Sequence, residues 1–176
     1  NKNLLFEIGT EEAIKNFSID EFILLISKLY IDLPREIYNN ILYAVVQSRV
    51  KLNLREQKNY GEFNPHRLEA MVKICKKFKL LSKEHNGDYL TNKEIKMKFD
   101  IGLDAINIAP QFGQIETQCY LDEMGVDERF YQICLKSNRW KKWVPSTFNP
   151  EGNKRELIII CGHYILSDPE FLKIKP

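Results

Sequence analysis

The feature that most constrains the fold is an alternation of short apolar segments with longer amphipathic ones. Apolar segments of strand length lie near residues 4–8, 41–47, 80–85 and 104–109, and stretches with helical spacing separate them. This rhythm is typical of βα units, whose strands pair in parallel. The sequence therefore predicts an α/β fold that contains four βα units.

Local signals predict where the helices begin and end. Ser18 precedes a segment with apolar residues three and four positions apart, and Asn64 and Pro65 supply an N-cap followed by proline at the first helical position. Thr91 begins a capping box, and Gly102 ends the same helix. Each of these residues is expected to fix a helix terminus.

A C-terminal helical extension is expected from about residue 127. Its last part contains the aliphatic run 157–160, which is interpreted as a helix although so compact a run also fits a strand. The whole chain, 1–176, is interpreted as a single domain.

Two architectures fit four βα units: an open doubly wound sheet and one half of a (β/α)8 barrel. No GxGxxG or GxxxxGK[ST] motif follows any strand, so no nucleotide cofactor is expected. Polar residues follow all four strands, and barrel enzymes place their chemistry at such strand ends. We therefore predict the C-terminal half of a TIM barrel. Because a strand begins almost at Asn1, we expect a fragment of a longer chain.

Composition narrows the functional classes. The formal charge of +2 is spread along the chain, so no basic stripe argues for a nucleic-acid partner. No apolar run approaches the roughly 18 residues that cross a bilayer, which gives no support for a membrane. The four cysteines form no CxxC pair, so reduced cysteines in a cytoplasmic protein are expected.

Side-chain alternation predicts which polar residues converge. In the last strand Ile106 and Ile108 are expected to face the helices, which leaves Ala105 and Asn107 facing inward. Applied to all four strands, this parity gathers five polar side chains at the carboxyl-terminal mouth. They are Glu7, Gln47, Lys83, His85 and Asn107.

Chemical roles follow from residue type. Glu7 and His85 could bind a metal or act as acid and base, together with Asp88 as a further catalytic candidate. A catalytic zinc usually needs three protein ligands, so an oxygen-rich magnesium or manganese site remains an alternative. Lys83 could form a Schiff base with a carbonyl substrate, or it could be ion-paired with Glu7 or Glu84 and unreactive.

Substrate contacts are predicted in the loops after the strands. Asn86 and Gly87 in one loop, and Gly113 in the segment 111–114, could hold a phosphate on backbone NH groups. Arg49, just after the second strand, could add positive charge, although a solvated loop residue is the simpler interpretation. With Gln47 and Asn107, these residues form the predicted substrate site.

Three short motifs resemble one family. The segment 83–89, KEHNGDY, followed after an apolar strand by Ala109 and Pro110, is similar to the HxxDY and [GA]P elements of the D-tagatose-bisphosphate aldolase accessory subunits. The opening FEIGTE resembles their IGTE strand. The resemblance implies a barrel fold and sugar-phosphate aldol chemistry. Lys83 stands where an acidic residue would be expected, which indicates a divergent relative.

Three functions remain open from the sequence. The first is a sugar-phosphate aldolase or related lyase that acts on a phosphorylated ketose with the assistance of a metal. The second is a non-catalytic accessory subunit that stabilises a catalytic partner, or a homo-oligomer. The third rests on the opening LLFEIGTEE, which also resembles the start of the glycyl-tRNA synthetase β subunit.

Overall fold

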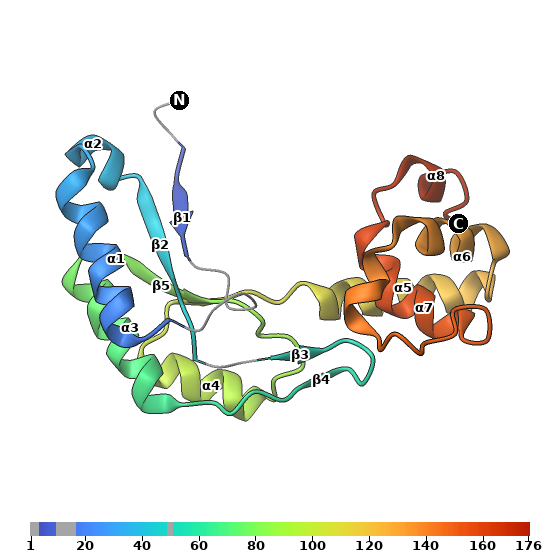
Figure 1. The fold of residues 1–176 in the computed structure, drawn as a ribbon, viewed down its shortest axis with the longest axis horizontal. Helices are drawn as coiled ribbons and strands as arrows, with labels where there is room; N and C mark the ends of the chain where they lie inside the picture. Colours follow the sequence, from blue (N-terminus) through green and yellow to red (C-terminus); the bar gives the residue numbers. More distant parts are fainter. Residues whose placement is uncertain (1–3, 10–16, 49–50) are drawn as a thin grey trace. The chain divides into compact units, whose positions relative to one another are not determined.

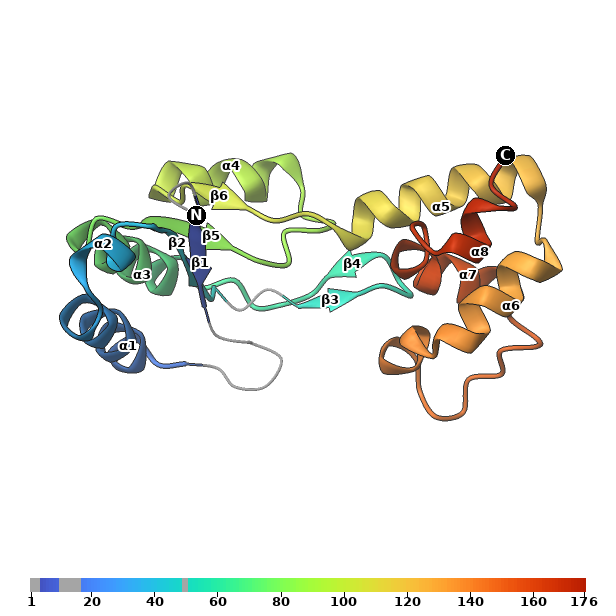
Figure 2. The same cartoon turned by 90° about the horizontal axis from the view of Figure 1, so that it is seen from above.

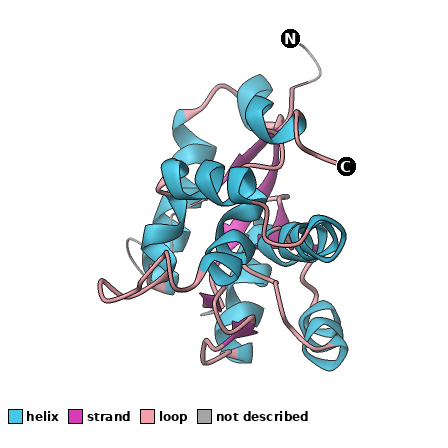
Figure 3. Ribbon diagram, turned by 90° about the vertical axis from the view of Figure 1, so that its right-hand side faces the viewer, coloured by secondary structure: helices cyan, strands magenta, loops and turns pink. Residues whose placement is uncertain are grey.

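The computed structural model describes residues 4–9, 17–48 and 51–176. Helices make up more of the regular structure than strands do (Figure 3). The strands are β1 (Phe6–Ile8), β2 (Ile41–Val46), β3 (Leu52–Asn53), β4 (Lys58–Asn59), β5 (Leu81–Glu84) and β6 (Ala105–Ile106). The helices are α1 (Ile19–Asp32), α2 (Arg35–Tyr38), α3 (Pro65–Lys77), α4 (Asn92–Ile101), α5 (Pro110–Met124), α6 (Glu128–Ser137), α7 (Lys154–Cys161) and α8 (Pro169–Leu172), with 3-10 turns η1 (Arg139–Trp143) and η2 (Gly162–Tyr164).

The chain divides into two compact units. The first comprises Asn1–Lys51 and Asn59–Asn107, and the second comprises Leu52–Lys58 and Ile108–Pro176. The sequence had been interpreted as one domain with a helical extension from about residue 127. The structure instead begins the second unit just after β6, because α5 packs against α7 and η2 of that unit.

The first unit contains a four-stranded parallel sheet in the order β1-β2-β5-β6 (Figure 1). Lys83 pairs with Val45 on one side and with Ala105 on the other. The spatial order of these strands is their order along the chain. The predicted α/β fold with a parallel sheet is therefore confirmed.

Helix α3 builds the core of the first unit. It packs against β2, β5, α1 and α4, and Figure 2 shows α1 and α3 side by side. Its apolar residues recur at the helical period, so one stripe is buried against the sheet. The fully buried members of this core include Ile26, Ala44, Leu68, Met71 and Cys75.

The predicted helix termini are confirmed in the first unit. The Ser18 and Thr91 side chains each accept a hydrogen bond from the third helical NH group, and a glutamate completes a capping box in both cases. Asn64 caps α3, and Gly102 ends α4 at φ 106°. These local signals therefore set the helices that cover the sheet.

The second unit is mainly helical. Phe130, Tyr131, Leu157, Ile158 and Phe171 lie in its buried core. The aliphatic run 157–160 belongs to α7, as predicted. Three of its four residues, Leu157, Ile158 and Ile160, have fully buried side chains in this core, which explains why the run lacks a clear polar face.

Two expected loops contain regular structure. The polar segment after β2, where no strand was predicted, includes the paired strands β3 and β4. The segment 111–114 was expected to be a phosphate-binding loop and lies inside α5. Pro110 at the helix start explains the second difference, because proline is favoured at the first helical position.

Among the residues that the structure describes, no helix is both long and apolar enough to span a lipid bilayer.

Candidate functional site

Glu7 brings two basic side chains together on one face of the sheet. Its Oε2 lies 2.5 Å from Lys83 Nζ, and its Oε1 lies 2.6 Å from His85 Nε2. Glu7 belongs to β1, whereas Lys83 lies in β5 and His85 directly follows it. We call Glu7, Lys83 and His85 the Glu7 cluster.

The cluster spans three strands. Strand β2 lies between β1 and β5, and Lys83 Nζ is 5.3 Å from the centre of the Tyr43 ring on β2. Because alternate residues of a strand face the same side, Lys83 and His85 point to the same face. Long side chains from β1 and β5 can thus meet above β2. The cluster is partly open to solvent, with 43% of the His85 side chain exposed.

The neighbours of Glu7 control its ionisation. Partial burial acts to raise the pKa of Glu7, but hydrogen bonds and positive charge from Lys83 and His85 outweigh it and hold the pKa below its ordinary value. Glu7 is therefore a carboxylate at neutral pH. The geometry fits an ion pair between Glu7 and Lys83, as the sequence had allowed.

The contact with Glu7 also orients His85. If Nε2 carries the proton and donates to Glu7 Oε1, the other ring nitrogen, Nδ1, remains a proton acceptor. A carboxylate that fixes a histidine tautomer in this way is a common arrangement in acid–base catalysis. The cluster therefore offers a carboxylate, an ammonium group and an oriented imidazole.

The cluster does not by itself form a metal site. Among residues 4–9, 17–48 and 51–176, no three His, Cys, Asp or Glu side chains lie together as a ligand set. Glu7 and His85 contribute two donors, and Glu7 is already engaged by an ammonium group. Because zinc sites usually take three protein ligands, these described donors do not complete one.

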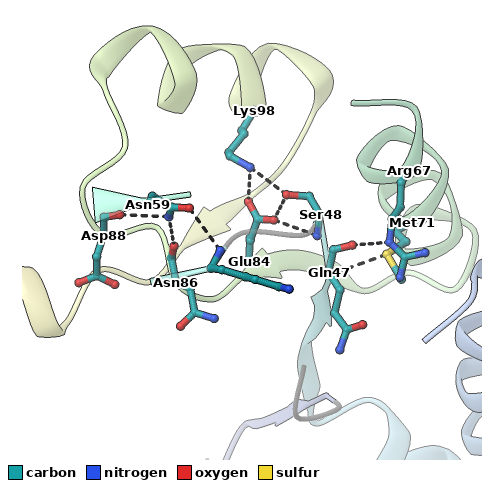
Figure 4. Close-up of polar contacts among 10 residues, drawn as sticks. Gln47, Ser48, Asn59, Arg67, Met71, Glu84, Asn86, Asp88 and Lys98 are labelled. Atoms are coloured by element: carbon teal, nitrogen blue, oxygen red, sulfur yellow. Dashed lines mark hydrogen bonds and ion pairs between the residues drawn. The ribbon is translucent and has the colours of Figure 1, made fainter. Parts of the chain in front are cut away.

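Gln47 does not join the cluster in the way that strand parity predicted. Its side-chain oxygen accepts a hydrogen bond from the Phe17 NH at 3.1 Å, and its backbone oxygen accepts one from Arg67 Nε at 2.6 Å (Figure 4). Arg67 also donates to the Phe17 carbonyl. Gln47 is buried, and these bonds tie the end of β2 to the start of α1 and α3.

Asn86, Gly87 and Asn107 hold neighbouring backbone segments together. Gly87 donates its NH to the Asn107 carbonyl, 2.9 Å away, and Asn107 donates to the Glu84 carbonyl, 2.8 Å away. A β-carbon on Gly87 would overlap the Ile106 side chain. Gly87 is thus needed for close backbone approach between two protein segments, where the sequence had suggested approach to a ligand.

The Asn59 side chain fixes the loop after β5. Its amide nitrogen donates to the carbonyls of Asn86 and Asp88, at 2.8 and 3.1 Å (Figure 4). Asp88 is 1% exposed, and burial together with the Asp88 charge raises the pKa of Tyr89 to about 12. Asp88 therefore lies in a buried environment, unlike the partly open Glu7 cluster.

The two remaining predicted site residues are Arg49 and Gly113. Arg49 lies outside the described residues. Gly113 lies in α5 of the second unit, where a β-carbon would overlap the His163 side chain. A glycine at this point permits close packing of α5 against η2, which is a structural reason for its presence.

Sequence reasoning missed a second carboxylate cluster. Glu84 Oε2 lies 2.7 Å from Lys98 Nζ of α4, and each side chain is only 1% exposed. Ser48 donates its backbone NH and its hydroxyl to Glu84 Oε1, and the Lys98 ammonium donates to the Ser48 hydroxyl at 2.9 Å (Figure 4). We call Glu84, Lys98 and Ser48 the buried network.

A weak signal for the buried network does exist in the sequence. Lys98 lies three positions after Ile95, on the face that a helix starting at Thr91 would turn toward the sheet. Glu84 alternates with Lys83 and so must face the helices if Lys83 faces away from them. Positions that face the core, such as those of Lys98 and Glu84, are more often occupied by apolar residues. An internal ion pair is predicted only when the two opposite charges are considered together.

Comparison of the chain with models of known protein families, with curated proteins and with solved structures gave no match.

Proposed function

We propose that the first unit is half of a (β/α)8 barrel and that the protein is a carbon–carbon lyase, resembling the sugar-phosphate aldolases, that acts on a phosphorylated ketose. The strand order β1-β2-β5-β6 supports the barrel, because each parallel strand neighbours the next one in the chain. A doubly wound sheet reverses that order at its switch point. We expect such a protein to act in the cytoplasm.

The Glu7 cluster is the observation that carries the proposed chemistry. Aldol cleavage needs a base that removes a hydroxyl proton while the adjacent carbon–carbon bond breaks. The bonding electrons pass to the substrate carbonyl and form an enolate, which later takes up a proton at carbon. His85 Nδ1 would accept the hydroxyl proton, and the Lys83 ammonium would stabilise the negative oxygen.

The ion pair argues against a covalent role for Lys83. A Schiff base requires a neutral amine, whereas Lys83 Nζ lies 2.5 Å from a carboxylate oxygen of Glu7. In the proposed mechanism Glu7 positions both Lys83 and His85. Borohydride treatment in the presence of a ketose phosphate should therefore leave Lys83 unmodified when its peptide is mapped by mass spectrometry.

The test is cleavage of ketose bisphosphates, with release of triose phosphate followed in a coupled assay. His85→Ala should lower kcat/KM by at least about 100-fold, the usual effect of removing a general base. His66→Ala is the matched control, because His66 lies at the start of α3 outside the cluster. No turnover by the wild-type protein, or equal losses in the two variants, would contradict the proposal.

A non-catalytic accessory subunit is the second candidate. Strand β1 lies at the edge of the sheet, and Leu4, Leu5 and Phe6 are 50%, 58% and 42% exposed. Apolar side chains beside an open strand edge favour a partner that covers them. Co-purification with a catalytic subunit, and no turnover by the protein alone, would favour this function over the first.

A further inference from the structure

A cationic pocket lies at the other end of the sheet of the first unit. Its volume is about 470 Å³. It is bordered by the first residue of β2, Ile41, and by Leu80, which directly precedes β5. The full lining is Tyr30, Arg35, Tyr38, Asn39, Ile41, Lys77, Phe78, Lys79 and Leu80.

The lining contains three cations and no carboxylate. Arg35 belongs to α2, Lys77 ends α3, and Lys79 follows two residues later. None of the three forms an ion pair with any residue that the structure describes. In contrast, Lys73 on the same helix pairs with Glu69. No described carboxylate neutralises the charges of the pocket, whereas Glu69 neutralises that of Lys73.

The aromatic side chains give this pocket a fixed wall. The Tyr38 hydroxyl donates to the Phe78 carbonyl at 3.0 Å, and the Tyr30 ring packs edge-on against the rings of Tyr38 and Phe78. Arg35 lies over Tyr30, with 4.4 Å from its guanidinium carbon to the ring centre, and donates to the Tyr30 hydroxyl. Such stacking restrains the guanidinium group and leaves other NH donors for a ligand.

The lysines are not needed to complete the end of α3. Leu80 donates its NH to the Cys75 carbonyl and Lys79 donates to the Lys76 carbonyl, so backbone groups already satisfy the last turn. Lys79 adopts φ 60°, at the position where helices usually end with glycine. A lysine therefore occupies a backbone conformation that favours glycine, and its side chain lines the pocket.

We propose that the cationic pocket binds a small molecule that carries phosphate groups. Three cations from two chain segments surround a space with no competing carboxylate, and Arg and Lys side chains are the usual ligands of phosphate oxygens. The pocket lies at the amino-terminal ends of β2 and β5. The Glu7 cluster involves the carboxyl-terminal part of β5, so the two sites are separate and the pocket does not depend on the proposed function.

Pyrophosphate in metal-free buffer is the probe, and its binding is measured by calorimetry at roughly physiological salt. Lys79→Gly removes one cation and relieves the disfavoured φ, so this variant should fold at least as stably as the wild type. Its Kd for pyrophosphate should rise about fivefold, as should that of Arg35→Gln. Lys73→Gln removes one charge from α3 outside the pocket and should change the Kd less than about twofold.

Three outcomes would overturn the proposal. One is the absence of pyrophosphate binding by the wild-type protein at millimolar concentration. The second is an equal rise in Kd for Lys79→Gly and Lys73→Gln, which would indicate a general effect of net charge. The third is tighter binding of a single-stranded oligonucleotide than of pyrophosphate, lost in Lys79→Gly, which would assign the surface to nucleic acid.

Discussion

Two carboxylates on opposite faces of one sheet are each paired with a lysine, in very different surroundings. Glu7 meets Lys83 at 2.5 Å, with 30% and 19% of the two side chains exposed. Glu84 meets Lys98 at 2.7 Å, with both side chains 1% exposed. The first pair can meet a substrate, whereas the second is enclosed between the sheet and α4.

The comparison shows that the degree of burial of an ion pair determines how much the pair contributes to stability. Removing one partner from a buried ion pair leaves an uncompensated charge inside the protein, which is strongly destabilising. A partly exposed pair contributes little to stability because water solvates either partner alone. We therefore expect the buried network to control folding of the first unit and the Glu7 cluster to control activity.

The largest effect is expected for Lys98→Met. This change leaves Glu84 buried without its cation and should lower the free energy of unfolding by about 3–5 kcal/mol. Both tryptophans, Trp140 and Trp143, belong to the second unit, so hydrogen exchange of β2 and β5 amides is the appropriate measurement. The double variant Glu84→Gln/Lys98→Met should recover part of the loss. Unchanged exchange in Lys98→Met would show that the pair does not stabilise the unit.

Ser48→Ala should have a smaller effect. It removes the hydroxyl that donates to Glu84 and accepts from Lys98, but keeps the backbone NH contact of 3.1 Å. A loss of about 1–2 kcal/mol is expected in the same exchange measurement. A loss as large as that of Lys98→Met would mean that the hydroxyl, rather than the ion pair, dominates the network.

Glu7→Gln should change stability by less than about 1 kcal/mol. Asp32→Asn, which breaks the exposed pair between Lys28 and Asp32, is a matched control for losing one surface ion pair. In the cleavage assay Glu7→Gln should lower kcat/KM at least about tenfold, since it no longer positions His85 as a carboxylate does. Equal activity of Glu7→Gln and Asp32→Asn would contradict the proposed role of Glu7.

The smallest effect is expected for the pH dependence of the stability that Glu7 contributes. The pKa of Glu7 is lowered in the folded protein from its ordinary value of 4.5, so the unfolded chain binds the proton first as the pH falls. The stability that Glu7 provides is therefore complete above about pH 5 and lost as the pH falls through the folded pKa. Acid unfolding curves of the wild type and Glu7→Gln should converge at low pH. A gap that widens as the pH falls would contradict the lowered pKa.

Part of the candidate site could be predicted because strand alternation is local. Lys83 and His85 lie two residues apart and share a face, and Glu7 is a charged residue in an apolar strand. The partners of Gln47 and the overlap that requires Gly87 depend on α3 and β6, which are distant in the chain. Sequence spacing carries no information about those contacts. Substrate binding by Gln47 and Gly87 stays a prediction.

The sequence alone determined the helix termini and the parallel βα rhythm, because caps and apolar periodicity act over only a few residues. Only the tertiary structure decided that α5 joins a second unit and that Lys98 of α4 neutralises Glu84. The reason is physical. The free energy of burying a charge or an apolar helix face depends on which segments pack against it, and that choice is made by the whole folded chain.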